Sequence, residues 1–126
     1  MAHALFQPFT LKNLQLKNRI LMAPMTRCRA GEGDVPTALM AEHYAQRASA
    51  GLIVSEGVAP SADGIGYCRT PGIYNQQQVE AWRRVTDAVH AEDGLIVAQI
   101  MHVGRVSNHL NKPAGSETVA PSAIRA

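Results

Sequence analysis

The sequence has few cysteines, few aromatic residues, and no long run of apolar or like-charged residues. Its two cysteines, Cys28 and Cys68, are widely spaced and form no CxxC pair, which argues against zinc and favours two reduced thiols over a disulfide. No apolar run approaches the roughly 20 residues of a membrane span. The twelve Lys and Arg are scattered and the net charge is only +2, so neither nucleic acid nor an anionic membrane is an expected partner.

Two phosphate-binding fingerprints and a targeting signal are also missing. No GxGxxG follows the first predicted strand and no GxxxxGK[ST] occurs, which argues against a dinucleotide fold and a P-loop. Histidines and carboxylates at metal-ligand spacing are lacking, so no metal site is expected. The first residues have no basic region followed by an apolar segment, so we expect no signal peptide and a cytoplasmic location.

The length limits the fold. With 126 residues, 46% of them hydrophobic and 17% charged, the chain is expected to form one globular domain with a real core. A complete (β/α)8 barrel needs about 250 residues. Any barrel in this chain must therefore be partial.

Three segments share one form, an apolar run that ends in polar residues. They predict strands near residues 19–25, 51–56 and 95–101, each covered on both faces as in a parallel sheet. The carboxyl ends of parallel strands meet at one edge, so their polar tips can converge on one ligand. A hairpin is predicted over residues 5–16, with its turn at Lys12-Asn13, where Asn tolerates a positive φ.

Two helices are predicted between these strands. The first follows a Thr37 cap and runs to about Ala48, with Leu39, Met40, Tyr44 and Ala48 on its buried face. The second covers residues 76–92, with Asn75 as its N-cap and Gln78 completing an approximate capping box.

The element order predicts an α/β fold. A hairpin followed by β-α-β-α-β is typical of a parallel sheet, and both a flavodoxin-like or Rossmann sheet and a barrel begin in this way. Because the dinucleotide fingerprint is absent, we favour the N-terminal part of a (β/α)8 TIM barrel, with a leading hairpin and about three βα units in one domain, residues 1–126.

Three residues at the predicted strand ends are candidates for ligand contacts. The hydroxyl of Thr26 can bind a ligand carbonyl or a neighbouring backbone group. Gly57 can admit a flat ring or serve only a turn. The carboxamide of Gln99, inside an apolar strand, needs partners from a ligand or from the backbone. Glu56 is more typical of a structural ion pair, with Arg19 or Arg105 as its expected partner.

Five motifs occur in order along nearly the whole chain. They stand at residues 22–27 (MAPMTR), 46–56 (QRASAGLIVSE), 82–83 (WR) with 90–94 (HAEDG), 99–105 (QIMHVGR) and 120–123 (APSA). Taken together, they resemble the N-terminal portion of the Old Yellow Enzyme family of flavin ene-reductases. The resemblance implies a (β/α)8 barrel that binds FMN noncovalently at the carboxyl ends of its strands.

The resemblance also implies roles for individual residues. Thr26 would hydrogen-bond a flavin carbonyl and tune the reduction potential, and Gln99 would hold the pyrimidine edge. The other flavin contacts would be Ala23, Pro24, Met25 and Gly57, the last at a position where relatives often have alanine. Tyr67 and Met101 would border the substrate pocket, and relatives commonly have tryptophan at the latter position.

The implied reaction takes hydride from NADPH or NADH onto FMN and reduces an activated C=C bond, as in α,β-unsaturated carbonyl or nitro compounds. The family's substrate-activating His/His or His/Asn pair and tyrosine have no counterpart in this chain, nor do the loops that bind the FMN phosphate. We therefore expect a complementing chain or self-association to complete the barrel. The alternatives are a noncatalytic, self-associating partial barrel or flavin-binding scaffold, and a relative of dienoyl-CoA reductase or amine dehydrogenase.

Overall fold

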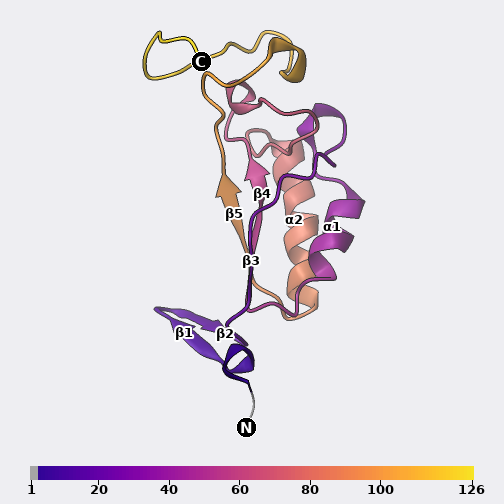
Figure 1. Ribbon diagram of the computed structural model, residues 1–126. Coiled ribbons are helices and arrows are strands. Elements are labelled where there is room, and N and C mark those ends of the chain that lie inside the picture. The colour runs from indigo at the N-terminus through magenta and orange to yellow at the C-terminus, as the bar shows by residue number, and fades with distance from the viewer. Residues whose placement is uncertain (1–2) are drawn as a thin grey trace.

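The computed structural model describes residues 3–126. Over these residues the chain forms a parallel sheet, two helices packed on one face of it, and a separate hairpin (Figure 1). The regular elements are β1 (Phe9–Leu11), β2 (Leu14–Leu16), β3 (Leu21–Met22), α1 (Ala38–Ala45), β4 (Leu52–Val58), α2 (Gln76–Ala91) and β5 (Ile96–Ile100). Short 3-10 turns lie at η1 (Ala4–Phe6), η2 (Glu32–Asp34), η3 (Ala62–Gly64) and η4 (His109–Asn111). The α/β alternation agrees with the expected class.

The hairpin of β1 and β2 lies at the amino ends of the sheet strands (Figure 1). Its register pairs Phe9 with Leu16 in an antiparallel ladder. The positive φ of the turn, 52°, falls on Lys12 and not on Asn13, where it was expected. The guanidinium of Arg19 lies over the Phe9 ring, 5.1 Å from its centroid, and so joins the hairpin to the chain that leads into the sheet.

The sheet has the order β3-β4-β5, with both pairs parallel. β3 covers only two residues of the segment expected near 19–25. The prediction that this strand is covered on both faces is wrong, because Leu21 is 52% exposed. The helices cover only one face of the sheet, and no described element covers the other (Figure 1). Val97 of β5 faces this open side, because its neighbour Ile96 packs against the core, and it is exposed.

Asn18 joins the starts of β3 and β4. Its Oδ1 accepts from the backbone N–H of Gly51 at 2.8 Å and of Ile20 at 3.0 Å, and its Nδ2 donates to the Ser49 carbonyl at 2.8 Å. A Cβ at Gly51 would lie 2.2 Å from the Asn18 carbonyl oxygen. Only glycine allows this approach, which fixes the relative position of the two strands.

The core lies between the sheet and the helices. Its buried members are Ala30, Met40, Tyr44, Ala48, Ile53, Val58, Trp82, Val85 and Val89. The indole N–H of Trp82 donates to the Gly72 carbonyl at 3.0 Å, so this large side chain is buried without an unpaired donor.

The start of α2 confirms the predicted cap. Oδ1 of Asn75 accepts from the Gln78 N–H at 2.9 Å. The side chain of Gln78 does not return to the cap residue, as a capping box requires. It accepts from the Tyr74 N–H and donates to the Gly33 carbonyl, both at 2.9 Å, and thereby holds the loop of η2 against the helix.

The helix α1 differs from its prediction in extent and in one residue of its buried face. It follows Thr37 as expected but ends at Ala45, and the Thr37 hydroxyl donates to the Arg29 carbonyl at 3.1 Å instead of capping the helix. Leu39 was expected to be buried, but it is 57% exposed. Neither helix in the described part of the chain has the length and hydropathy needed to cross a bilayer.

Neighbouring side chains on α1 provide a test of this packing. Met40 is fully buried, and its replacement by alanine leaves a cavity, so Met40→Ala is expected to lower the free energy of unfolding by about 2–4 kcal/mol. Leu39→Ala, the matched control at an exposed position, is expected to change it by less than about 0.5 kcal/mol. Urea denaturation followed by the fluorescence of Trp82 measures both. Equal effects would contradict the described orientation of α1.

Candidate functional site

The candidate residues gather at the carboxyl edge of the sheet. Residues 23–26 leave β3, Gly57 lies near the end of β4, and Gln99 lies near the end of β5. Gly57 and Gln99 are direct partners in the sheet register. Because β3 and β5 both flank β4, the expected convergence of three strand ends is present in the structure.

A β-bulge shapes this edge. Val54 pairs with Val97 and Gly57 pairs with Gln99, so β4 has two residues where β5 has one. The hydroxyl of Ser55, in the bulge, accepts from the Gln99 N–H at 3.1 Å and donates to the Glu56 carbonyl at 2.7 Å. The sequence analysis assigned no role to Ser55, although a buried hydroxyl in an apolar strand was the available signal.

Two polar side chains at this edge have no hydrogen-bond partner among the described residues. Within residues 3–126, neither the Thr26 hydroxyl nor the Gln99 carboxamide makes a hydrogen bond to another residue. Thr26 is exposed and Gln99 is half-buried. The alternative that backbone groups satisfy them is therefore not realised, and both remain available to a ligand.

Gly57 contacts Met101. A Cβ built on Gly57 would lie 2.6 Å from Cε of Met101, so the missing Cβ makes room for this side chain. Met101 is anchored by its backbone, whose N–H donates to the Val58 carbonyl at 2.9 Å. A flat ring against the Gly57 backbone therefore requires a rotation of the flexible Met101 side chain.

The remaining candidates lie around this edge. Ala23, Pro24 and Met25 are all exposed, and Met25 lines a hollow of about 440 Å³ whose walls are both apolar, as at Phe6, and polar, as at Arg47. Tyr67 is 48% exposed and follows Gly66, where a Cβ would lie 2.3 Å from Cγ2 of Val103. The Tyr67 loop therefore packs against the segment that continues from Met101.

Glu56 lies on the opposite side of β4 in a buried network. Arg27 donates to Oε1 of Glu56 at 2.8 Å, and the Tyr44 hydroxyl donates to the same oxygen at 3.1 Å. The Glu56 N–H in turn donates to the Tyr44 hydroxyl at 2.8 Å. Burial is the main cause that raises the pKa of Tyr44 to about 12, so the phenol remains protonated as a donor.

The predicted partners of Glu56 were wrong. Arg19 stacks on the hairpin at the amino end of the sheet, and Arg105 donates to the Ile124 carbonyl at 2.7 Å in the C-terminal segment. Arg27 is the partner because it leaves β3 beside β4 at the level of Glu56. The adjacent pairing of these strands, which the sequence did not specify residue by residue, decides the ion pair.

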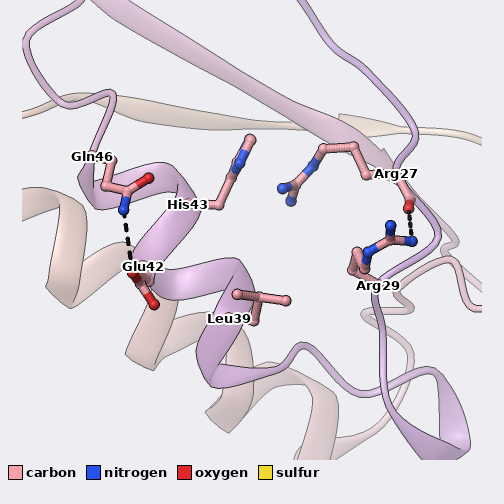
Figure 2. A pocket seen from close by; sticks show the side chains of 6 residues that line it. All are labelled: Arg27, Arg29, Leu39, Glu42, His43 and Gln46. Carbon is pink, nitrogen blue, oxygen red and sulfur yellow. Dashed lines mark hydrogen bonds between the residues drawn. The ribbon is translucent and has the colours of Figure 1, made fainter.

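A cavity of about 500 Å³ lies between α1 and the segment after β3 (Figure 2). Its lining residues are Arg27, Arg29, Leu39, Glu42, His43 and Gln46. Figure 2 shows the Arg27 side chain extending across the cavity toward the His43 ring. Burial, with the nearby charges of Arg27 and Arg47, lowers the pKa of His43 to about 4. His43 is therefore neutral at pH 7 and adds no charge for binding an anion.

The buried ion pair provides a matched test against a surface pair. Glu56→Gln removes the carboxylate from a fully buried side chain and leaves Arg27, 20% exposed, without its counter-charge, so the free energy of unfolding is expected to fall by about 2–3 kcal/mol. The control is Asp93→Asn, which removes a fully exposed carboxylate 4.0 Å from Lys17 and is expected to have no measurable effect. Urea denaturation compares the two. A loss no larger for Glu56→Gln than for the control would contradict the buried network.

Comparisons with known proteins cover nearly the whole chain. The model of the NADH:flavin oxidoreductase / NADH oxidase family matches residues 4–126. The chain is 46% identical over 117 residues to 12-oxophytodienoate reductase 7 of Oryza sativa subsp. japonica. This alignment covers 92% of this chain and 29% of the relative. It is 42% identical over 120 residues to a probable flavin mononucleotide-dependent alkene reductase of Leishmania infantum, covering 95% of this chain and 33% of the relative.

Solved structures give the same result. Morphinone reductase matches with a TM-score of 0.91 and 48% identity over 97% of this chain and 32% of its own. The old yellow enzyme homologue from Zymomonas mobilis matches with a TM-score of 0.89 and 50% identity, over 97% of this chain and 34% of its own. A structure of morphinone reductase in complex with tetrahydroNAD matches with a TM-score of 0.90.

These matches confirm the resemblance to the N-terminal portion of the Old Yellow Enzymes. The chain spans about a third of the length of the relatives it matches, and it has the fold of the corresponding part. At this level of identity over nearly the whole chain, the family is established: the chain belongs to the NADH:flavin oxidoreductase / NADH oxidase family of FMN oxidoreductases.

Proposed function

We propose that this chain supplies the part of a flavin-dependent oxidoreductase that holds the FMN ring. The complete enzyme takes hydride from NADPH or NADH and reduces activated C=C bonds of α,β-unsaturated carbonyl or nitro compounds. Family membership and relatives named as alkene or oxophytodienoate reductases support this function. The observation that carries it is the pair of unpartnered polar groups, on Thr26 and Gln99, beside Gly57 at one edge of the sheet.

The residues present fit a flavin ring. A carboxamide offers one acceptor and two donor hydrogens, which suits the alternating carbonyl and N–H groups of a pyrimidine edge, and Gln99 has this group free. Thr26 offers an O–H to a ring carbonyl. The exposed residues 23–25 offer backbone and apolar surface to the ring. Bound FMN would supply hydride-transfer chemistry that no side chain in this chain can provide.

Thr26 has a tuning role in this proposal. Hydrogen bonds to a charged acceptor are stronger than those to a neutral one, and the reduced flavin ring carries more negative charge than the oxidised ring. An O–H donated by Thr26 to a ring carbonyl therefore favours the reduced ring. Tyr67 and Met101 border the substrate pocket, while the groups that polarise the substrate and donate the proton belong to another part of the enzyme.

We further propose that a complementing chain or self-association completes a (β/α)8 barrel around this part. The sheet exposes Leu21 and Val97, whose neighbours Met22 and Ile96 pack against the core, on the face opposite the helices, where a barrel places its interior. Buried polar atoms beside the cavity of Figure 2 also lack partners within the described residues, namely Arg27 Nε, His43 Nε2 and Glu56 Oε2. Both features are typical of a surface that packs against further polypeptide.

Flavin binding tests the ring-holding role. Since this chain contributes contacts to the ring and not to the phosphate, lumiflavin, which is the ring without the phosphate, is expected to bind it within about twofold of FMN. Thr26→Val and Gln99→Leu each remove a hydrogen bond and are expected to weaken both ligands about five- to tenfold. Quenching of flavin fluorescence on titration measures these affinities.

Matched controls use the same changes away from the edge. Thr86→Val and Gln77→Leu lie on α2 and are expected to leave both affinities unchanged. Equal losses in controls and site variants, or a strong preference for FMN over lumiflavin, would contradict the assignment of these residues to the ring.

Assembly state and turnover test the need for completion. Size-exclusion chromatography with added FMN is expected to show self-association of the isolated chain, because its apolar face is uncovered. NADPH oxidation in the presence of 2-cyclohexenone is expected only after the remaining part is supplied. A stable, well-folded 13.6 kDa monomer would refute the need for completion, and the absence of turnover in the completed assembly would favour a noncatalytic scaffold.

A further inference from the structure

The two cysteines, 40 positions apart in the sequence, lie on neighbouring segments of the fold. Cys28 follows Thr26 by two residues, and Cys68 directly follows Tyr67. Their segments run side by side, because the Ala30 N–H donates to the Arg69 carbonyl at 3.0 Å and Nε of Arg69 donates to the Ala30 carbonyl at 3.0 Å. Both thiols are free, and the side chain of Cys68 is among the groups that raise the pKa of the Cys28 thiol, as expected for neighbouring side chains.

We propose that Cys28 and Cys68 form a reversible disulfide that ties the segment after β3 to the Tyr67 loop. A disulfide requires two cysteines on neighbouring segments, and the hydrogen bonds between Ala30 and Arg69 hold the segments of Cys28 and Cys68 side by side. The wide sequence spacing indicated two separate thiols. The fold brings them together because the loops after β3 and β4 leave neighbouring parallel strands at the same edge.

The backbone at Cys28 supports a role for its side chain. Its φ of 56° lies in the left-handed region, which glycine adopts more easily than any residue with a Cβ. Arg69, next to Cys68, also has a positive φ, of 53°. A residue with a thiol therefore stands at a position where the backbone alone favours glycine.

The oxidant we assign is a low-molecular-weight disulfide such as glutathione disulfide. The Cys68 thiolate, on the exposed residue, attacks one sulfur of glutathione disulfide and releases one glutathione, which leaves a mixed disulfide. The Cys28 thiolate then attacks Sγ of Cys68 and releases the second glutathione. Two protein thiols are oxidised, and one glutathione disulfide is reduced to two glutathiones. The two protons lost by the protein thiols protonate the two released glutathione thiolates.

The pH dependence of the closing step follows from the surroundings of Cys28. Burial, with the hydrogen bond and charge of Cys68 and the charge of Glu56, raises the pKa of the Cys28 thiol, and Arg29 opposes this. The thiolate fraction therefore increases with pH, and closure is expected to accelerate between pH 7 and pH 9. If the proposed function holds, the bond constrains Thr26 and Tyr67, which lie within two residues of the linked cysteines.

Oxidation of the full chain with glutathione disulfide tests the proposal without flavin. We expect intact mass spectrometry to show the loss of two hydrogens, and peptide mapping without reductant to show a Cys28–Cys68 linked peptide. The oxidised chain is expected to melt about 5 °C or more above the reduced chain, because the bond restricts the unfolded state. Dithiothreitol should reverse both changes.

Serine variants are the matched controls. In Cys28→Ser, the reaction is expected to stop at the mixed disulfide between glutathione and Cys68. Neither Cys28→Ser nor Cys68→Ser should gain thermal stability on oxidation. In concentrated urea the wild-type chain is expected to give adducts on both cysteines, because the folded contact that directs pairing is lost. A stable glutathione adduct on Cys68 of the folded wild type, a dimer linked through Cys68, or no reaction would each overturn the proposal. None of these outcomes bears on FMN binding.

Discussion

The buried carboxylate of Glu56 determines how the segment after β3 is placed. A carboxylate with a fully buried side chain is costly unless cations and donors surround it, and here Arg27 and the Tyr44 hydroxyl both donate to one of its oxygens. Arg27 directly follows Thr26, so the ion pair anchors to β4 the end of the segment for which we propose flavin contacts. Tyr44 anchors the same carboxylate to α1. One charged group thus connects the sheet, the helix layer and the candidate site.

The bulge in β4 makes this network possible, because it sets the direction of the Glu56 side chain. By inserting one residue between Val54 and Gly57, it places Glu56 toward Arg27 and Tyr44 while Gly57 contacts Met101 and pairs with Gln99. A regular strand would alternate its side chains without this extra position. Structural burial on one side and ligand access on the other therefore depend on the same few residues, as expected for a site built on rigid elements.

Local signals predicted much of the fold, because they depend on neighbours in the sequence. Asn75 caps α2 as expected, since its side chain reaches the N–H of Gln78 only three residues away. The predictions that failed depended on distant contacts. Leu39 is exposed at the cavity between α1 and the segment after β3. The partner of Glu56 is Arg27 because β3 and β4 are neighbours in the sheet.

For the candidate site, the sequence alone determined which residue types stand at the strand ends and, through its motifs, the family to which the chain belongs. It left open whether Thr26 and Gln99 are satisfied by the backbone. Only the tertiary structure decided that they lack partners within residues 3–126, that Gly57 contacts Met101, and that the segments of Cys28 and Cys68 lie side by side. The physical reason is that periodicity and capping act between residues a few positions apart, whereas these contacts join segments through the register of parallel strands.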